Sequence, residues 1–301
     1  MLIFASGSCR ILTTLSYGIL AFSNEHSKLI MEKINPIHTY EHKKIINNNN
    51  ICESQNGYRN YLGLMYNTRQ HIQFLKFIKD EIKIPDSIMS KFIRYNSKEE
   101  LELRKNTIKK QFDDCEWYIF EISSLKLYNT SVNLLEIAEN TFTQIRTILY
   151  NSVNTNNLII SELETEMQEL YKYVNSKNIY EISPDIIGFE QEPTAMLTEE
   201  ALLADLCKIR NLIQKDKKIL FQTHFRPQII YDNDNIIENR EIIYNIVNKF
   251  CEDNEKTYIY DPSVLLKTNI EYIESDNSHF TIKGYYASIE YIYDTYLSKI
   301  N

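Results

Sequence analysis

The chain has 301 residues, of which 43% are hydrophobic and 25% charged, values typical of a globular protein with a sizeable core. Its formal net charge of −8 argues against binding to nucleic acid or to an anionic membrane. No apolar run reaches the roughly 18 residues of a membrane span, and no basic region precedes the first apolar residues. We therefore expect neither a membrane segment nor a secretory signal.

Short apolar runs bounded by turn signals predict four buried strands, at Leu2–Ala5, Trp117–Ile122, Ile219–Thr223 and Thr257–Tyr260. Helical patterns alternate with them, at 67–82, 197–215, 239–254 and 281–300. This alternation predicts an α/β fold with a doubly wound, mostly parallel sheet, whose active crevice lies at the carboxyl ends of the strands. We interpret two charged helical stretches, at about 85–111 and 130–180, as insertions on a single domain spanning residues 1–301.

The five cysteines are an odd number, widely scattered and without a Cys-x-x-Cys pair. Such usage is typical of a reducing compartment and argues against a disulfide framework or a zinc site. We therefore expect a cytoplasmic protein.

Near the end of the chain, the string ESDNSHFTIKGYY places Asp276 three residues before His279. Thr281 is a suitable N-cap for the last predicted helix, so both side chains should lie in the loop that enters it. In one loop a carboxylate can hold the tautomer of an imidazole while the other ring nitrogen faces a nucleophile, as a general base requires. The simpler interpretation is a surface Asp and a capping His.

At the start of the chain, the first predicted strand runs into Gly7-Ser8-Cys9-Arg10. This turn and the later D-x-x-H-F-T-x-x-G resemble, in the same order, the nucleophile turn and last block of the SGNH (GDSL-like) hydrolases. The turn is also similar to the G-S-C-F-A motif of a related group, from which Arg10 departs, and to the G-N-C-Q motif of capsule-polysaccharide proteins. The resemblance implies the three-layer, flavodoxin-like SGNH fold and a split catalytic triad.

The resemblance implies roles for the residues of both motifs. Aligned on the glycine, Cys9 takes the place of the nucleophile, whereas a one-residue shift gives that place to Ser8. His279 would be the general base and Asp276 the carboxylate that orients it. A thiol at a helix N-terminus and beside a His has a lowered pKa, which suits Cys9 to attack. The simpler interpretation of Cys9 is a small buried hydrophobe beside a packing glycine.

Two middle segments resemble the family less closely. NYLGLMYNTRQHI is similar to the block in which a glycine N–H helps to form the oxyanion hole, which implies that role for Gly63. Asn67 either begins the next helix or contributes a side-chain donor. WYIFEISSLK lacks the Asn of the family's third block, so Ser123 or Ser124 would have to supply a hydroxyl donor. Losing one oxyanion donor typically lowers the rate about 10²–10³-fold.

Other polar residues follow predicted strands. His224 and Arg226, in FQTHFRPQ, should project at the active edge. Arg226 is a candidate for holding an anionic substrate group, and His224 is a second candidate for contact with substrate or oxyanion. We interpret Glu121 as a buried, hydrogen-bonded carboxylate without a catalytic role. The sequence offers no partner for His71.

Together these features predict an esterase or acyltransferase acting on acyl esters, expected to be O-acetyl, of a carbohydrate or small molecule through a Cys/Ser-His-Asp triad and an acyl-enzyme. No metal or organic cofactor is required, no nucleic-acid or membrane partner is expected, and the sequence does not set the oligomeric state. An alternative is a catalytically inactive glycan-binding or scaffold protein of the same fold, which the missing Asn supports. A papain-like cysteine hydrolase fits poorly, because its His would need an antiparallel barrel.

Overall fold

The computed structural model describes residues 1–15, 25–37, 40–42, 46–47, 50–51, 58–60, 65–81, 98–127, 195–226, 238–267, 269–275 and 278–299. Their main sheet is parallel and contains β1 Leu2–Ser6, β2 Asn35–Ile37, β7 Trp117–Glu121, β10 Lys218–Gln222 and β11 Thr257–Tyr260. The spatial order β2-β1-β7-β10-β11 is the 2-1-3-4-5 order of flavodoxin-like sheets. The predicted doubly wound α/β fold is therefore confirmed.

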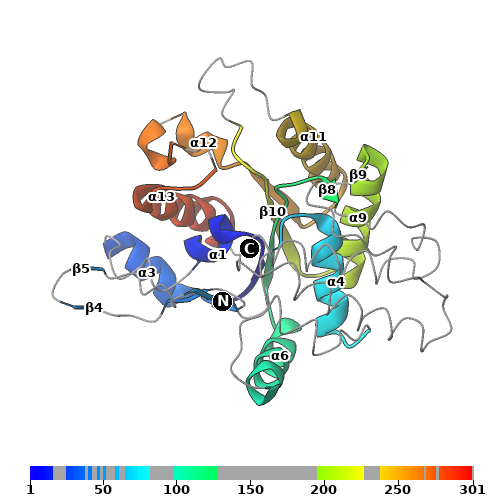
Figure 1. Ribbon diagram of the computed structural model, residues 1–301, viewed down its shortest axis with the longest axis horizontal. Helices are drawn as coiled ribbons and strands as arrows, with labels where there is room; N and C mark the ends of the chain where they lie inside the picture. Colours follow the sequence, from blue (N-terminus) through cyan, green and yellow to red (C-terminus); the bar gives the residue numbers. More distant parts are fainter. Residues whose placement is uncertain are drawn as a thin grey trace, which may run out of the picture.

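Helices cover both faces of the sheet and complete three layers (Figure 1). One face carries α4 Thr68–Ile78, α6 Lys98–Phe112, α9 Glu199–Leu212 and α11 Glu238–Asp253. The other carries α1 Cys9–Thr14, α3 Glu25–Lys33, α12 Ser263–Leu266 and α13 Ile282–Ile292. The strands predicted from apolar runs are buried for this reason, since helices pack on both sides of them.

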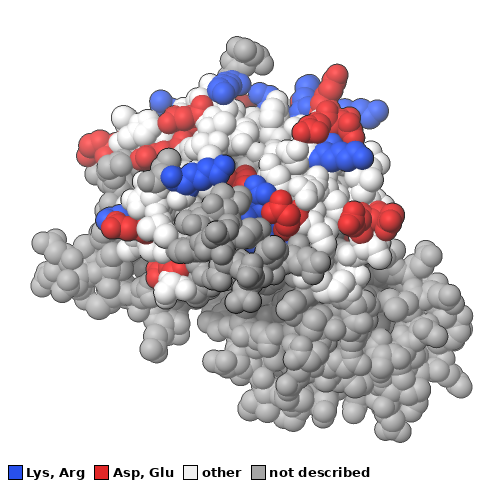
Figure 2. Space-filling view, turned by 90° about the horizontal axis from the view of Figure 1, so that it is seen from above, with Lys and Arg blue, Asp and Glu red and all other residues white. Residues whose placement is uncertain are grey.

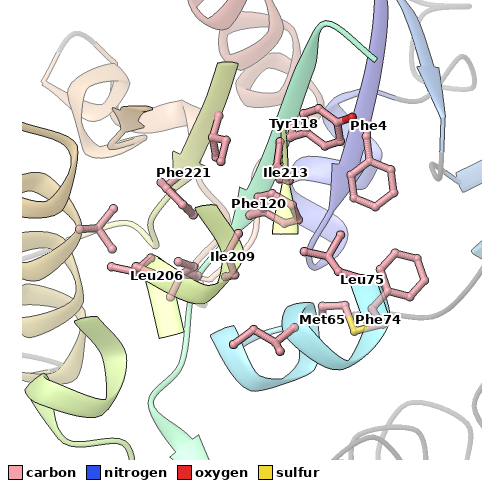
Figure 3. Packing of buried hydrophobic residues seen from close by; sticks show 14 of the residues in the cluster. Phe4, Met65, Phe74, Leu75, Tyr118, Phe120, Leu206, Ile209, Ile213 and Phe221 are labelled. Carbon is pink, nitrogen blue, oxygen red and sulfur yellow. The ribbon is translucent and has the colours of Figure 1, made fainter. Parts of the chain in front are cut away.

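The core is divided between the two faces by the alternation of side chains along each strand. Phe4, Phe120 and Phe221 pack toward α4 and α9 (Figure 3), whereas Ile3 and Ile119 pack toward α1 and α13. Each fully buried side chain of this size contributes about 2 kcal/mol of transfer free energy. The two clusters hold the helices against the sheet. They thereby also set the positions of the loops at the carboxyl ends of the strands.

Edge strand β2 was not among the predicted strands. It pairs only with β1 in the main sheet, and its three residues include Pro36. Proline has no backbone N–H to donate to a neighbouring strand, so within sheets it is tolerated mainly on edge strands. The run is short and interrupted by proline, and the sequence pattern therefore did not predict it.

Shorter elements complete the described residues: β3 Tyr40–His42 pairs with β6 Tyr58–Asn60, β4 Ile46–Asn47 with β5 Asn50–Ile51, and β8 Lys126–Leu127 with β9 Ala195–Met196. The 3₁₀-helix η3 spans Ile270–Tyr272, and the π-helix η4 spans Tyr293–Leu297 directly after α13. Within the described ranges, no helix is both long and apolar enough to cross a membrane.

The predicted helix caps are confirmed where the structure describes them. The side chain of Thr281 accepts a hydrogen bond from Gly284 N and begins α13. The helix α6, at Lys98–Phe112, overlaps the second half of the first predicted insertion. The second, at 130–180, lies outside the described residues, and the single-domain organisation stays a prediction.

Charges on the described surface are mixed. Figure 2 views the molecule from above, and on the part of that face that is described Lys and Arg side chains alternate with Asp and Glu. Neither sign forms a continuous field there.

Candidate active site

The carboxyl ends of three neighbouring strands bring the candidate residues to one edge of the sheet. Ser8 follows β1, Glu121 ends β7, and His224 follows β10. In a sheet of this topology, β1 and β7 flank the switch point at which ligands bind. The site is therefore built on rigid elements of the fold.

Ser8 is engaged in holding the turn after β1. It is the N-cap of α1 and is only 1% exposed. Its Oγ lies 2.7 Å from each carboxylate oxygen of Glu121, and its backbone N–H donates to Glu121 Oε2 at 2.9 Å. The Ser8 hydroxyl is thus engaged in a hydrogen bond to the Glu121 carboxylate, which lies beneath the turn.

Gly7 is required by this close packing. A Cβ at this position would lie 2.5 Å from Glu121 Cβ and 2.5 Å from Ile11 Cγ2, closer than real Cβ contacts allow. The Gly7 carbonyl also accepts a hydrogen bond from Met65 N at 2.9 Å. The backbone of the turn can therefore pack directly against Glu121 only because residue 7 is a glycine.

Cys9 is the first residue of α1, directly after the buried Ser8. The structure describes its backbone but not its side chain. The next residue, Arg10, is buried and donates from Nε to Glu121 Oε1 at 2.7 Å, while its Nη2 also pairs with that oxygen. The turn that carries Cys9 is therefore held from below by an ion pair.

The loop of His279 meets this turn. Arg10 Nη1 donates to the carbonyl of Ser278 at 2.9 Å, across 268 residues of sequence. His279 is exposed, and its carbonyl accepts a hydrogen bond from Glu274 N at 2.9 Å. Asp276 lies outside the described residues. The structure thus brings the residue after Cys9 into contact with the residue before His279.

The expected oxyanion donors are partly committed elsewhere. Asn67 begins α4 and accepts from Gln70 N in a capping box, which confirms the helix-start interpretation. The backbone N–H groups of Ser123 and Ser124 donate to Tyr66 O at 2.9 and 3.0 Å. Ser123 Oγ also lies 3.4 Å from Tyr66 O, and Gly63 lies outside the described residues. Their catalytic roles stay predictions.

His224 lies at the same edge and is buried. Burial lowers its pKa well below the ordinary value, and the positive charges of Arg10 and Arg240 lower it further. The imidazole is therefore neutral near neutral pH. Its Nδ1 is buried and forms no hydrogen bond with any of the described residues.

Arg226 is surrounded by carboxylates of the protein itself. Its Nε donates to Asp261 Oδ2 at 3.1 Å, and its Nη1 donates to Glu241 at 2.9 Å. The guanidinium also lies 3.5 Å from the ring centre of Tyr244. Because two carboxylates balance this charge, the geometry favours a structural role over the predicted contact with an anionic substrate, which stays untested.

His71 has partners that the sequence did not reveal. Its Nε2 lies 2.7 Å from the carbonyl of Glu121, and its Nδ1 lies 3.0 Å from Ser6 Oγ. A carbonyl only accepts, so Nε2 carries the proton and Nδ1 accepts from the serine. Burial lowers the pKa of His71 to about 4. A neutral imidazole therefore joins β1 to β7 just below the site.

We expect the protein to lose stability as the pH falls from 6.5 toward 4, in part through His71. Its folded pKa of about 4 lies below the ordinary 6.5, so the unfolded chain binds the proton more readily in this window. The contribution is complete above 6.5 and amounts to about 3 kcal/mol. Urea unfolding of His71→Gln should show a flatter pH dependence, whereas the exposed His26→Gln should follow the native protein. Equal pH dependence in all three proteins would refute this assignment.

The Arg10–Glu121 pair is what sequence reasoning missed. Glu121 is a charged residue near the end of the predicted apolar strand WYIFEI, and Arg10 lies in the turn that follows the first predicted strand, directly before an apolar run. Opposite charges in two such places were a usable signal for a buried pair.

Among the described residues, no group of three or more His, Cys, Asp and Glu side chains could hold a metal ion.

Comparison with known proteins gives a family. The sequence pattern of the TviD N-terminal domain matches residues 1–283, nearly the whole chain. Among curated proteins, none matches the chain.

Proposed function

The chain belongs to the TviD N-terminal domain family, and from this premise we propose that it is an enzyme that hydrolyses or transfers acyl esters of a carbohydrate, O-acetyl esters in the first instance. The family name is that of a Vi capsule polysaccharide acetyltransferase-related protein, which supports a carbohydrate substrate. The observation that carries the proposal is the hydrogen bond from Arg10 to Ser278, because it joins the turn of Cys9 to the loop of His279.

In the proposed reaction, His279 takes the proton of the Cys9 thiol, and the thiolate attacks the acyl carbonyl. The tetrahedral intermediate collapses, the C–O bond to the leaving alcohol breaks, and His279 returns the proton to that oxygen. Water or a sugar hydroxyl then gives its proton to His279 and attacks the thioester carbonyl. The C–S bond breaks, the carboxylic acid or the new ester leaves, and the thiolate takes the proton back from His279. Asp276 orients the imidazole. Water as acceptor makes the enzyme an esterase, and a sugar hydroxyl makes it a transferase.

Cys9 is favoured over Ser8 as nucleophile. The Ser8 hydroxyl is buried and donates to Glu121, which also pairs with Arg10. A hydroxyl that donates to a buried, ion-paired carboxylate is held in the interior of the turn rather than presented to a substrate. Ser8 thus supports the turn, and Cys9 follows it at the first position of α1.

Competitive labelling tests the proposal. We expect iodoacetamide to alkylate Cys9 at neutral pH about 10-fold faster than Cys207, an exposed free thiol on α9, because a neighbouring His base would favour the thiolate of Cys9. Mass spectrometry gives both rates in one sample. A serine-directed fluorophosphonate bound to Ser8 would transfer the nucleophile's role to that residue.

A second candidate function is glycan binding without catalysis. The observation that favours it is the commitment of Ser123 and Ser124 N–H groups to Tyr66, at the place where the family's Asn is missing. If neither Cys9 nor Ser8 reacts faster than a reference residue of its own type, this candidate replaces the enzyme.

A further inference from the structure

We propose that Arg10 is a positioning residue, which fixes the loop of His279 against the turn of Cys9 and so sets the geometry of base and nucleophile. The inference rests on the proposed function, since Arg10 acts through those two residues. The proposal assigns a role to the buried Arg10–Glu121 ion pair, which takes no direct part in the proposed reaction.

The guanidinium uses three different nitrogen atoms in two directions. Nε and Nη2 bind Glu121, while Nη1 donates to the carbonyl of Ser278 at 2.9 Å. Glu121 is fully buried and also accepts from the N–H and Oγ of Ser8. The group that anchors Arg10 is therefore the same group that shapes the nucleophile turn.

The loop of His279 has other anchors. One comes from α11, where Arg240 Nη2 donates to Ser278 Oγ at 3.4 Å, and others lie toward η3. Thr281 N donates to Tyr272 O at 3.0 Å, and an isolated β-bridge joins Ile273 to Phe280. These contacts hold the loop to the segment before it. The Arg10–Ser278 hydrogen bond adds the connection to α1, across the site.

Only an arginine satisfies this arrangement among the basic residues. Its planar fork presents fixed N–H directions, so one side chain can pair with a carboxylate and reach a carbonyl elsewhere. A lysine carries the same charge on one nitrogen and cannot span both partners with the same geometry. A phenylalanine, as in G-S-C-F-A, would leave Glu121 without its counter-charge.

Arg10→Lys tests the proposal, with Arg210→Lys as its control. Arg210 also donates to carbonyls, those of Lys217 and Ile213 at 3.0 and 3.3 Å, but it lies at the end of α9 and before β10. We expect Arg10→Lys to lower kcat/KM for p-nitrophenyl acetate about 10–100-fold, mainly through kcat, because small misplacements of reacting groups have effects of this size. Arg210→Lys should leave it unchanged.

A double-mutant cycle separates positioning from a general structural effect. If Arg10 acts through His279, adding Arg10→Lys to His279→Ala should cause no further loss, and both single variants should share one pH profile for alkylation of Cys9. Losses that multiply, with an unaltered alkylation profile in Arg10→Lys, would overturn the proposal. If His279→Ala alone changes neither activity nor alkylation, the proposed function fails, and this inference with it.

A paired replacement covers the case in which Arg10→Lys does not fold. In Arg10→Met with Glu121→Gln, the methionine fills the space and the amide oxygen still accepts from Ser8, so no unpaired charge stays buried. We expect this protein to fold and to show the alkylation profile of His279→Ala. A native profile and native activity would overturn the positioning role.

Discussion

We expect His279→Ala to release acetate from p-nitrophenyl acetate about 10³-fold more slowly than the native protein, a loss within the range of rate enhancements that a general base typically contributes. The imidazole handles the proton in both halves of the proposed reaction, so its loss slows the formation and the breakdown of the acyl-enzyme alike. The release of acetate and of nitrophenol should therefore fall together. Initial rates of both products measure this.

The control for this prediction is His26→Ala. His26 is exposed on α3 and its Nε2 lies 3.5 Å from the Asp294 carboxylate, so it is a His–Asp pair outside the site. Its removal should leave both rates unchanged. Equal rates for native protein and His279→Ala would contradict the triad and favour the glycan-binding alternative.

Much of the fold was predictable because its information is local. The strands beginning at Leu2, Trp117, Ile219 and Thr257 are apolar runs of the length that a sheet covered on both faces requires. The structure places β10 at Lys218–Gln222 and β11 at Thr257–Tyr260, within one residue of the expectation. Alternation with helices then leaves few topologies.

The contacts of the site were less predictable, because they depend on register and helix phase. Ser6 aligns with Phe120 across β1 and β7, and this register sets Glu121 beside Gly7. A shift of one residue would send the carboxylate to the opposite face of the sheet. The partners of His71 depend in the same way on the rotation of α4 about its axis over the sheet. A local sequence pattern does not determine that rotation.

We expect Glu121→Ala to lower the free energy of unfolding by about 3–5 kcal/mol, the cost of leaving one member of a buried ion pair alone. The variant would strand the guanidinium of Arg10 and remove the acceptor of Ser8 N–H and Oγ. Because a domain is stable by only about 5–15 kcal/mol, this loss approaches the whole margin. Urea unfolding monitored by circular dichroism measures it.

Glu116→Ala is the matched control. Its carboxylate is half exposed, immediately before β7, and lies 3.9 Å from the N-terminal ammonium. Exposed pairs of this kind contribute about 0–1 kcal/mol, so the control should unfold near the native midpoint. If the two alanine variants unfold alike, the Arg10–Glu121 pair does not hold the turn.

The paired variant Arg10→Met with Glu121→Gln shows what the ion pair is for. If the pair served mainly stability, the double replacement would lose at least as much as Glu121→Ala. A buried ion pair replaced as a unit by neutral groups of similar volume is often nearly neutral in stability, so we expect the double variant to recover most of the loss. A protein that regains its stability but still lacks acetate release would show that Arg10 and Glu121 hold the site in its working geometry rather than the fold as a whole.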